Sequence, residues 1–150
     1  MAEGGQGGVV PKGTRKMGLD VGDRTIGIAL SDEMGWTAQP FSTLRRKRLD
    51  LDLDRLRKIA ADWGVSGMVV GMPLSMSGLA GSRARRVKAF ASELERALEI
   101  QVVFWDERLS TVEAERVLLQ ADLSRSKRRK QVDKVAAAII LQGYLDSVRR

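Results

Sequence analysis

Cysteine and histidine are both missing from this chain of 150 residues, and each absence excludes a class of chemistry. Without cysteine there are no disulfides and no thiolate metal sites. Without histidine, Ser-His-Asp and Cys-His catalysis are excluded, and so is histidine-ligated zinc. Any acid–base or metal chemistry must use carboxylates, Lys, Arg, Tyr or hydroxyl groups. Carboxylate-only sites favour hard ions such as Mg²⁺ or Mn²⁺.

Aromatic residues and long apolar runs are scarce. The aromatic residues are three Trp, three Phe and one Tyr, so recognition of bases by stacking is not expected. The longest apolar runs, such as 135–141, are far shorter than the ~20 residues of a membrane span, so we expect no membrane association. Length and composition predict a glycine-rich disordered tail over residues 1–15 and a single domain over residues 16–150.

Basic residues outnumber acidic ones by 26 to 19, which gives a net charge of +7 and a pI near 10.2. This excess predicts a polyanionic partner, most simply nucleic acid. Three basic clusters fall at the edges of predicted elements or between them, where side chains can reach a phosphate backbone. They are Arg45, Arg46, Lys47 and Arg48; Arg83, Arg85, Arg86 and Lys88; and Arg125, Lys127, Arg128, Arg129 and Lys130.

Hydrophobic periodicity predicts the element order β-β-β-α-β-α-β-α-α. Strands are expected at 17–20, 25–31, 41–45, 67–71 and 101–105, and helices at 49–63, 87–98, 110–121 and 132–144. Residues 72–81 and 123–130 are predicted loops that border the site discussed below. An antiparallel opening hairpin followed by alternating helices and strands predicts a three-layer α/β fold. Its mixed five-stranded sheet would carry helices on both faces.

Acidic residues stand where the predicted parallel strands end. Asp20 closes the first strand beside a tight glycine turn, and Asp106 and Glu107 close the last strand. Sites in such sheets collect beyond the carboxyl ends of the parallel strands. Successive strand residues point to opposite faces, so only Asp106 or Glu107 is expected to face the site, and spacing does not choose between them. Asp133, near the start of the last helix, either joins this site or simply favours the helix dipole.

A cluster of Asp20, Glu107 and Asp133 would suit phosphodiester hydrolysis. Bare carboxylates placed close together repel one another, so such a cluster persists only when it is protonated or bound to metal. Two divalent ions held this way can activate water and stabilise the leaving oxygen.

The motif Gly18-Leu-Asp20-Val-Gly22-Asp-Arg24-Thr-Ile-Gly27 resembles the opening of the YqgF/RuvX family of RNase H-like nucleases, also described as Holliday-junction-resolvase-like or as pre-16S rRNA nucleases. Three further stretches match in the same order, and the resemblance covers residues 16 to 147. They are Val69-Val-Gly71-Met-Pro73-Leu, Asp106-Glu107-Arg108-Leu-Ser110-Thr111 and Val132-Asp133-Lys134-Val-Ala136-Ala137.

The resemblance implies an RNase H-like fold and a nuclease that depends on Mg²⁺ or Mn²⁺. It matches Asp20, Glu107 and Asp133 to the family's three acidic positions and favours Glu107 over Asp106. It also implies trimming of the 5′ end of precursor 16S rRNA, or cleavage of branched DNA, in a bacterial cytoplasm. Symmetric cutting of a four-way junction would require a homodimer, whereas trimming of a single strand would not.

Several basic residues are candidates for binding nucleic acid. Arg24 and Arg108 are close in sequence to the proposed acids, so each is expected either to contact the scissile phosphate or to hold the acids apart through a salt bridge. The candidates as a group are Arg24, Arg83, Arg86, Arg108, Lys127, Arg128, Arg129 and Lys130.

Two other functions stay open at this level. The hairpin with Asp20, Gly22 and Gly27 also resembles the first phosphate loop of phosphotransferases of the actin–hexokinase type. Those enzymes need two such domains, whereas this chain has the length of one and no second hairpin of this kind. The other alternative is a nucleic-acid-binding ribosome-maturation or transcription factor without catalysis. Intact acids at all three positions argue against it.

Overall fold

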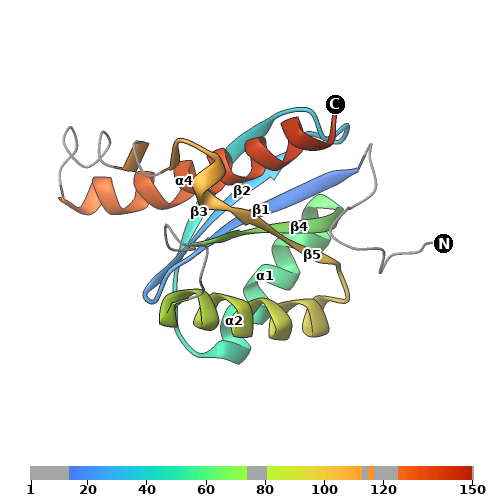
Figure 1. Ribbon diagram of the computed structural model, residues 1–150. Helices are drawn as coiled ribbons and strands as arrows, with labels where there is room; N and C mark the ends of the chain where they lie inside the picture. Colours follow the sequence, from blue (N-terminus) through green and yellow to red (C-terminus); the bar gives the residue numbers. More distant parts are fainter. Residues whose placement is uncertain (1–13, 74–80, 113–114, 117–124, 150) are drawn as a thin grey trace.

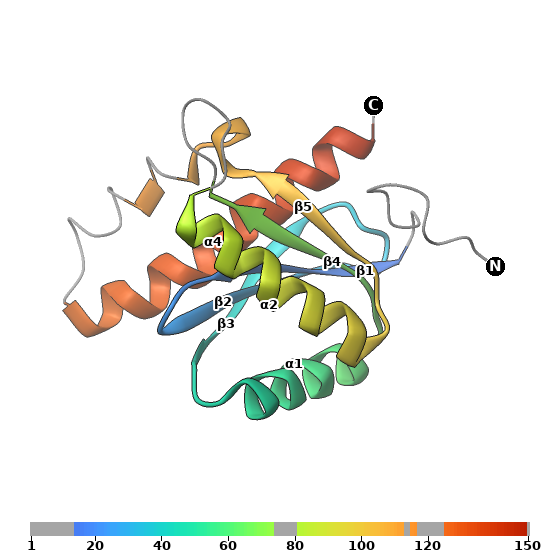
Figure 2. The ribbon, with the colours of Figure 1, turned by 60° about the horizontal axis from the view of Figure 1, so that its bottom comes forward.

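The predicted three-layer α/β architecture is confirmed. The computed structural model describes residues 14–73, 81–112, 115–116 and 125–149, with the side chains of 125–130 left aside. A five-stranded sheet lies between α4 on one side and α1 with α2 on the other (Figure 1; Figure 2). The elements are β1 (Arg15–Val21), β2 (Thr25–Ser31), β3 (Ala38–Arg45), α1 (Leu49–Trp63), β4 (Val65–Met72), α2 (Ser82–Leu98), β5 (Val102–Asp106), the 3₁₀ turn η1 (Glu107–Leu109) and α4 (Arg125–Val148).

The strand order is β3-β2-β1-β4-β5. β1 pairs antiparallel with β2, and β2 pairs antiparallel with β3. β1, β4 and β5 run parallel to one another, so their carboxyl ends meet at one edge of the sheet. In this register Asp20 lies opposite Gly27 of β2, and Met72 of β4 lies beside Asp106 of β5. The acids that end β1 and β5 are therefore at the same edge.

Side-chain alternation gives the sheet two apolar faces. One face packs on α1 and α2, and its core includes Leu19, Ile26, Ile28, Leu56 and Leu94. The other packs on α4, and its core includes Ala29, Val69, Ala137, Ile140 and Leu141. None of the helices in the described ranges is long and apolar enough to cross a bilayer.

Glycines allow α4 to lie unusually close to the sheet. A Cβ built on Gly18 would lie 2.7 Å from Leu141 Cβ and 2.9 Å from the Ala137 carbonyl oxygen. A Cβ built on Gly27 would overlap the backbone carbonyl of Asp133. No larger residue fits at either position unless the helix moves. The two glycines therefore set the height of α4 above β1 and β2, and with it the position of Asp133.

Several predicted boundaries need correction. The predicted loop at 123–130 is wrong for residues 125–130, because α4 already begins at Arg125. Lys and Arg are good helix formers, and no glycine or proline interrupts residues 125–142. β1 begins at Arg15, so the chain is ordered one residue before the predicted domain start. β3 begins at Ala38 and includes Pro40, which an edge strand tolerates.

Other expectations fall partly on residues outside the described ranges. This holds for the predicted tail up to residue 13 and for most of the loop at 72–81. Of the helix predicted at 110–121, residues 110–112 and 115–116 are described; Val112, Glu115 and Arg116 are helical, whereas Ser110 and Thr111 are not. The hydroxyl of Ser110 donates to the Glu107 carbonyl oxygen at 3.1 Å.

Candidate active site

Two buried carboxylates share one arginine at the carboxyl ends of β1 and β5. Asp20 in β1 and Glu107 in η1 are each 5% exposed. The Arg116 guanidinium donates to Asp20 Oδ1 at 2.9 Å and to Glu107 Oε1 at 3.3 Å. Nη2 of Arg83, from α2, lies 3.9 Å from the same oxygen of Asp20. Acids that are 87 positions apart in the sequence therefore meet around one cation.

The charge of Glu107 is poorly compensated. Burial raises the pKa of Glu107, the nearby charge of Asp20 raises it further, and Arg116 and Arg83 only partly oppose this. Its Oε2 atom is buried and has no hydrogen-bond partner within the described ranges. A Cβ on Gly71 of β4 would lie 2.8 Å from this oxygen, so the glycine keeps space for it. A further cation at this point would stabilise the ionised carboxylate.

The structure shows which of Asp106 and Glu107 faces the site, a choice that sequence spacing left open. Asp106 points away from Asp20 and accepts hydrogen bonds from the side chain of Arg108, the shortest at 2.6 Å. These bonds hold the pKa of Asp106 below its usual value. The η1 turn after Asp106 carries the next side chain inward. Glu107 is therefore the acid that lies with Asp20.

Asp133 lies at the same edge of the sheet but outside this pair. Its Oδ2 accepts a 2.5 Å hydrogen bond from the hydroxyl of Thr25, at the start of β2. Within the described ranges, no three acidic side chains are arranged as a metal site. The structure thus brings Asp20 and Glu107 together and does not bring Asp133 into a three-acid cluster. Arg116 compensates the charges of Asp20 and Glu107. A third carboxylate beside them would need a further cation, because clustered carboxylates repel one another.

The basic candidates divide into different environments. Arg108 pairs with Asp106, which is not one of the three proposed acids, and Arg86 pairs with Asp23 rather than with a proposed metal ligand. Arg83 faces Asp20, whereas Arg24 is exposed in the turn between β1 and β2. The side chains of Lys127, Arg128, Arg129 and Lys130 lie outside what the structure describes, so their role in binding stays a prediction.

Sequence reasoning missed Arg116 and Thr25. Arg116 follows the fully buried Val112 by four positions, and residues spaced by four share one face of a helix. An arginine on the buried face of a predicted helix was therefore the available signal for a buried ionic contact. Thr25 offered no comparable signal, because a threonine at the start of a strand is ordinary.

Sequence comparisons identify the family of this chain. A family model described as "RuvX: Holliday junction resolvase" matches residues 14–147. The chain belongs to the RuvX family. A relative from Desulforamulus reducens is 53% identical over 133 residues, covering 89% of this chain and 97% of its own. One from Symbiobacterium thermophilum is 57% identical over 130 residues, covering 87% and 90%. Both carry the name "Putative pre-16S rRNA nuclease".

Solved structures support the RNase H-like fold. RuvC of Thermus thermophilus, in complex with a Holliday junction substrate, matches with a TM-score of 0.58 at 11% identity, covering 91% of this chain and 96% of its own. The yeast mitochondrial Holliday junction resolvase Ydc2 matches with a TM-score of 0.55 at 10% identity, covering 91% and 80%. At such low identity these likenesses show the fold alone.

Replacing Arg116 with glutamine tests the shared cation directly. In EDTA, we expect Arg116→Gln to lower the free energy of unfolding by about 2 kcal/mol, because two buried acids lose their common partner. Mn²⁺ should then raise the melting temperature of the variant more than that of the parent protein. Arg96→Gln is the matched control, since Arg96 forms an exposed i,i+3 pair with Glu93 worth at most ~1 kcal/mol. Equal losses in the two variants would contradict the bridging role.

Proposed function

We propose that this protein is a nuclease that hydrolyses phosphodiester bonds with the help of divalent metal, and that it matures the 5′ end of precursor 16S rRNA in the bacterial cytoplasm. The observation that carries the proposal is the buried pair of Asp20 and Glu107 around one cation. Membership of the RuvX family and the names of relatives above 50% identity support it. The net charge of +7 suits a nucleic-acid substrate.

The residues present fit a hard divalent ion. Asp20 and Glu107 offer only oxygen donors, and Oε2 of Glu107 is buried without a hydrogen-bond partner among the described residues. Such donors suit Mg²⁺ or Mn²⁺. We assign Asp20 and Glu107 as metal ligands and Asp133 as the third acidic residue of the metal site. When bound, divalent ions activate water and stabilise the charge on the leaving oxygen of a phosphodiester.

The chain's own residues position these acids before substrate arrives. Gly71 leaves space for the carboxylate of Glu107, and Gly27 lets α4 bring Asp133 close to β2. The hydroxyl of Thr25 orients Asp133 by donating a hydrogen bond to it. Arg83 is half-exposed on α2 and close to Asp20. It is thus placed to attract the phosphate that the acids would otherwise repel.

Branched DNA is a second candidate substrate. It is favoured by the description of the family as a Holliday junction resolvase and by the junction bound to RuvC. Symmetric cleavage of a four-way junction requires two active sites, so this candidate implies a homodimer. Trimming of a single RNA strand carries no such requirement, and the mass of the active species in solution distinguishes the two.

One cleavage assay tests both candidates. Labelled RNA carrying the 5′ extension of 16S rRNA, a DNA strand of the same sequence and a four-way junction are each incubated with Mg²⁺, Mn²⁺ or EDTA. We expect cleavage of the RNA with either ion and none in EDTA. Preferential cutting of the junction would favour the second candidate. Strands that are bound but left uncut with every ion would overturn the nuclease proposal and leave a non-catalytic binding protein.

A further inference from the structure

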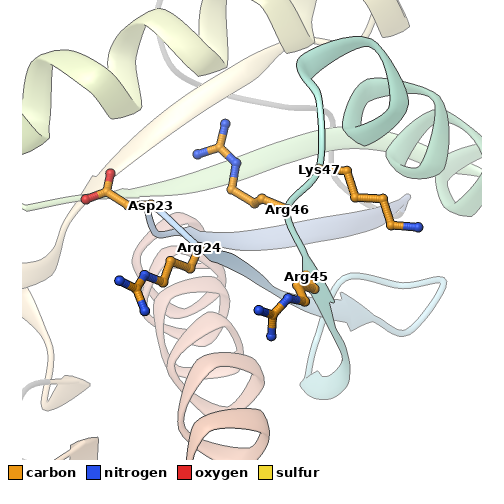
Figure 3. A pocket seen from close by; sticks show the side chains of 5 residues that line it. All are labelled: Asp23, Arg24, Arg45, Arg46 and Lys47. Atoms are coloured by element: carbon orange, nitrogen blue, oxygen red, sulfur yellow. The ribbon is translucent and has the colours of Figure 1, made fainter.

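A basic pocket lies beside the candidate active site, where the β1–β2 turn meets the end of β3. It has a volume of about 480 Å³ and is lined by Asp23, Arg24, Arg45, Arg46 and Lys47 (Figure 3). The backbone N–H of Arg46 donates to the carbonyl of Arg24 at 2.8 Å, which fastens the end of β3 to the turn. The pocket is thus formed by the β1–β2 hairpin and the neighbouring strand β3.

Two of the five lining side chains are already committed to the protein. The carboxylate of Asp23 accepts from Arg86 of α2 through both oxygens, at 3.1 and 3.2 Å. Arg46 donates to the Gly22 carbonyl at 2.8 Å and lies over the ring of Phe90. Arg86, which does not line the pocket, therefore neutralises the charge of Asp23. Arg46 is held in place as part of the pocket wall.

Three lining side chains are left for a ligand, and Figure 3 shows that Lys47 points away from Arg24 and Arg45. Arg24 and Arg45 are exposed, and neither guanidinium has a hydrogen bond or an ion pair within the described ranges. Figure 3 shows them extending from the strands in the same direction, whereas Arg46 points the opposite way. Two adjacent guanidinium groups without a carboxylate of their own form a site for an anion, and phosphate oxygens match their geometry.

Strand register places Arg45 on the same face of the sheet as the acids. Arg45 lies directly opposite Thr25 in the β2–β3 ladder, and directly opposite residues of an antiparallel pair share a face. Thr25 is the residue whose hydroxyl bonds Asp133. Asp20, opposite Gly27, is on that face as well. Asp20 near the end of β1, Thr25 at the start of β2 and Arg45 at the end of β3 also lie at one edge of the sheet. A strand bound at the acids can therefore continue along this edge toward the end of β3.

We propose that Arg24 and Arg45 form a second phosphate-binding site, which holds the backbone of the substrate strand outside the cleaved bond. This inference rests on the proposed nuclease function and adds the path of the strand along the edge of the sheet. Backbone contacts of this kind fix register and contribute affinity without reading sequence. Substrates long enough to reach from the acids to β3 gain from the site, and shorter ones do not.

The test compares Arg24→Gln/Arg45→Gln with the matched double variant Lys58→Gln/Arg96→Gln. The control removes the same charge from exposed ion pairs on α1 and α2. Binding of a 20-nucleotide single strand is measured in EDTA over a range of KCl concentrations. We expect the pocket variant to bind roughly 10-fold more weakly near 0.1 M salt and to show a salt slope flatter by about one, because fewer counterions are released. In cleavage with Mn²⁺, KM for this strand should rise while kcat is retained.

The outcomes separate this inference from the proposed function. If the parent cleaves and the pocket variant has the salt slope and KM of the control, the second site is overturned and the nuclease proposal stands. If the pocket variant loses affinity but the parent cuts no strand with any ion, the site stands as a binding site and the nuclease proposal fails. Melting temperatures of both variants should match the parent within a few degrees, since the exposed groups support little packing.

Discussion

Asp20→Asn is expected to remove metal-dependent cleavage while leaving the fold intact. The substitution keeps the size of the side chain and a partner for Arg116, but it removes the negative charge that a divalent ion requires. Metal catalysis contributes several kcal/mol to transition-state stabilisation, so the rate should fall by at least ~100-fold. The measurement is cleavage of the best substrate under single-turnover conditions.

Thermal unfolding provides an independent readout for Asp20→Asn. In EDTA, the variant should melt within a few degrees of the parent. Mn²⁺ at 100 times its dissociation constant stabilises a binding protein by ~2.7 kcal/mol, and this gain should disappear in the variant. The matched control is Asp106→Asn, which removes a nearby acid whose partner is Arg108. Full cleavage by Asp20→Asn would exclude this acid from the chemistry.

Gly27→Ala is expected to have the largest effect on stability. The added methyl group would overlap the carbonyl of Asp133, and its nearest contacts are backbone atoms of α4 rather than the end of a flexible side chain. The helix must therefore shift or the sheet must bend. We expect a loss of at least about 3 kcal/mol, at the upper end of the cost of overpacking. Denaturant unfolding of the purified protein measures it.

The control for Gly27→Ala is Gly81→Ala. Gly81 precedes α2, and a Cβ there would meet no atom of the described residues within 4 Å. Its φ of −85° is open to any residue, so the expected cost is ~1 kcal/mol or less. If a folded fraction of Gly27→Ala is recovered, its cleavage should be lower than its stability alone explains, because Asp133 has moved. Equal stability of the two variants would show that α4 is free to adjust.

Local patterns were sufficient for most of the sheet and for Asp20. Alternating and continuous apolar runs located all five strands, and the position of Asp20 at a strand end followed from the glycine turn after it. The parallel arrangement of β1, β4 and β5 brings the end of β5 near Asp20, but spacing left Asp106 and Glu107 as alternatives. These features depend on periodicity and connection rules, which act within short stretches of chain.

The remaining features depend on contacts between distant segments. Arg116 and Asp20 are separated by 96 residues, and no local pattern pairs them. The glycines at 18 and 27 look like ordinary strand interruptions until the register shows that both lie beneath α4. The basic residues at 125–130 belong to α4 rather than to the predicted loop, because Lys and Arg favour a helix that the following apolar face anchors on the sheet.

Arg116 has a consequence for the supply of metal to a nuclease of this kind. Its guanidinium bridges Asp20 and Glu107. In the proposed metal site, a divalent ion would therefore meet acids that the protein itself already holds together. Metal would then be required for activity and not for the assembly of the two acids.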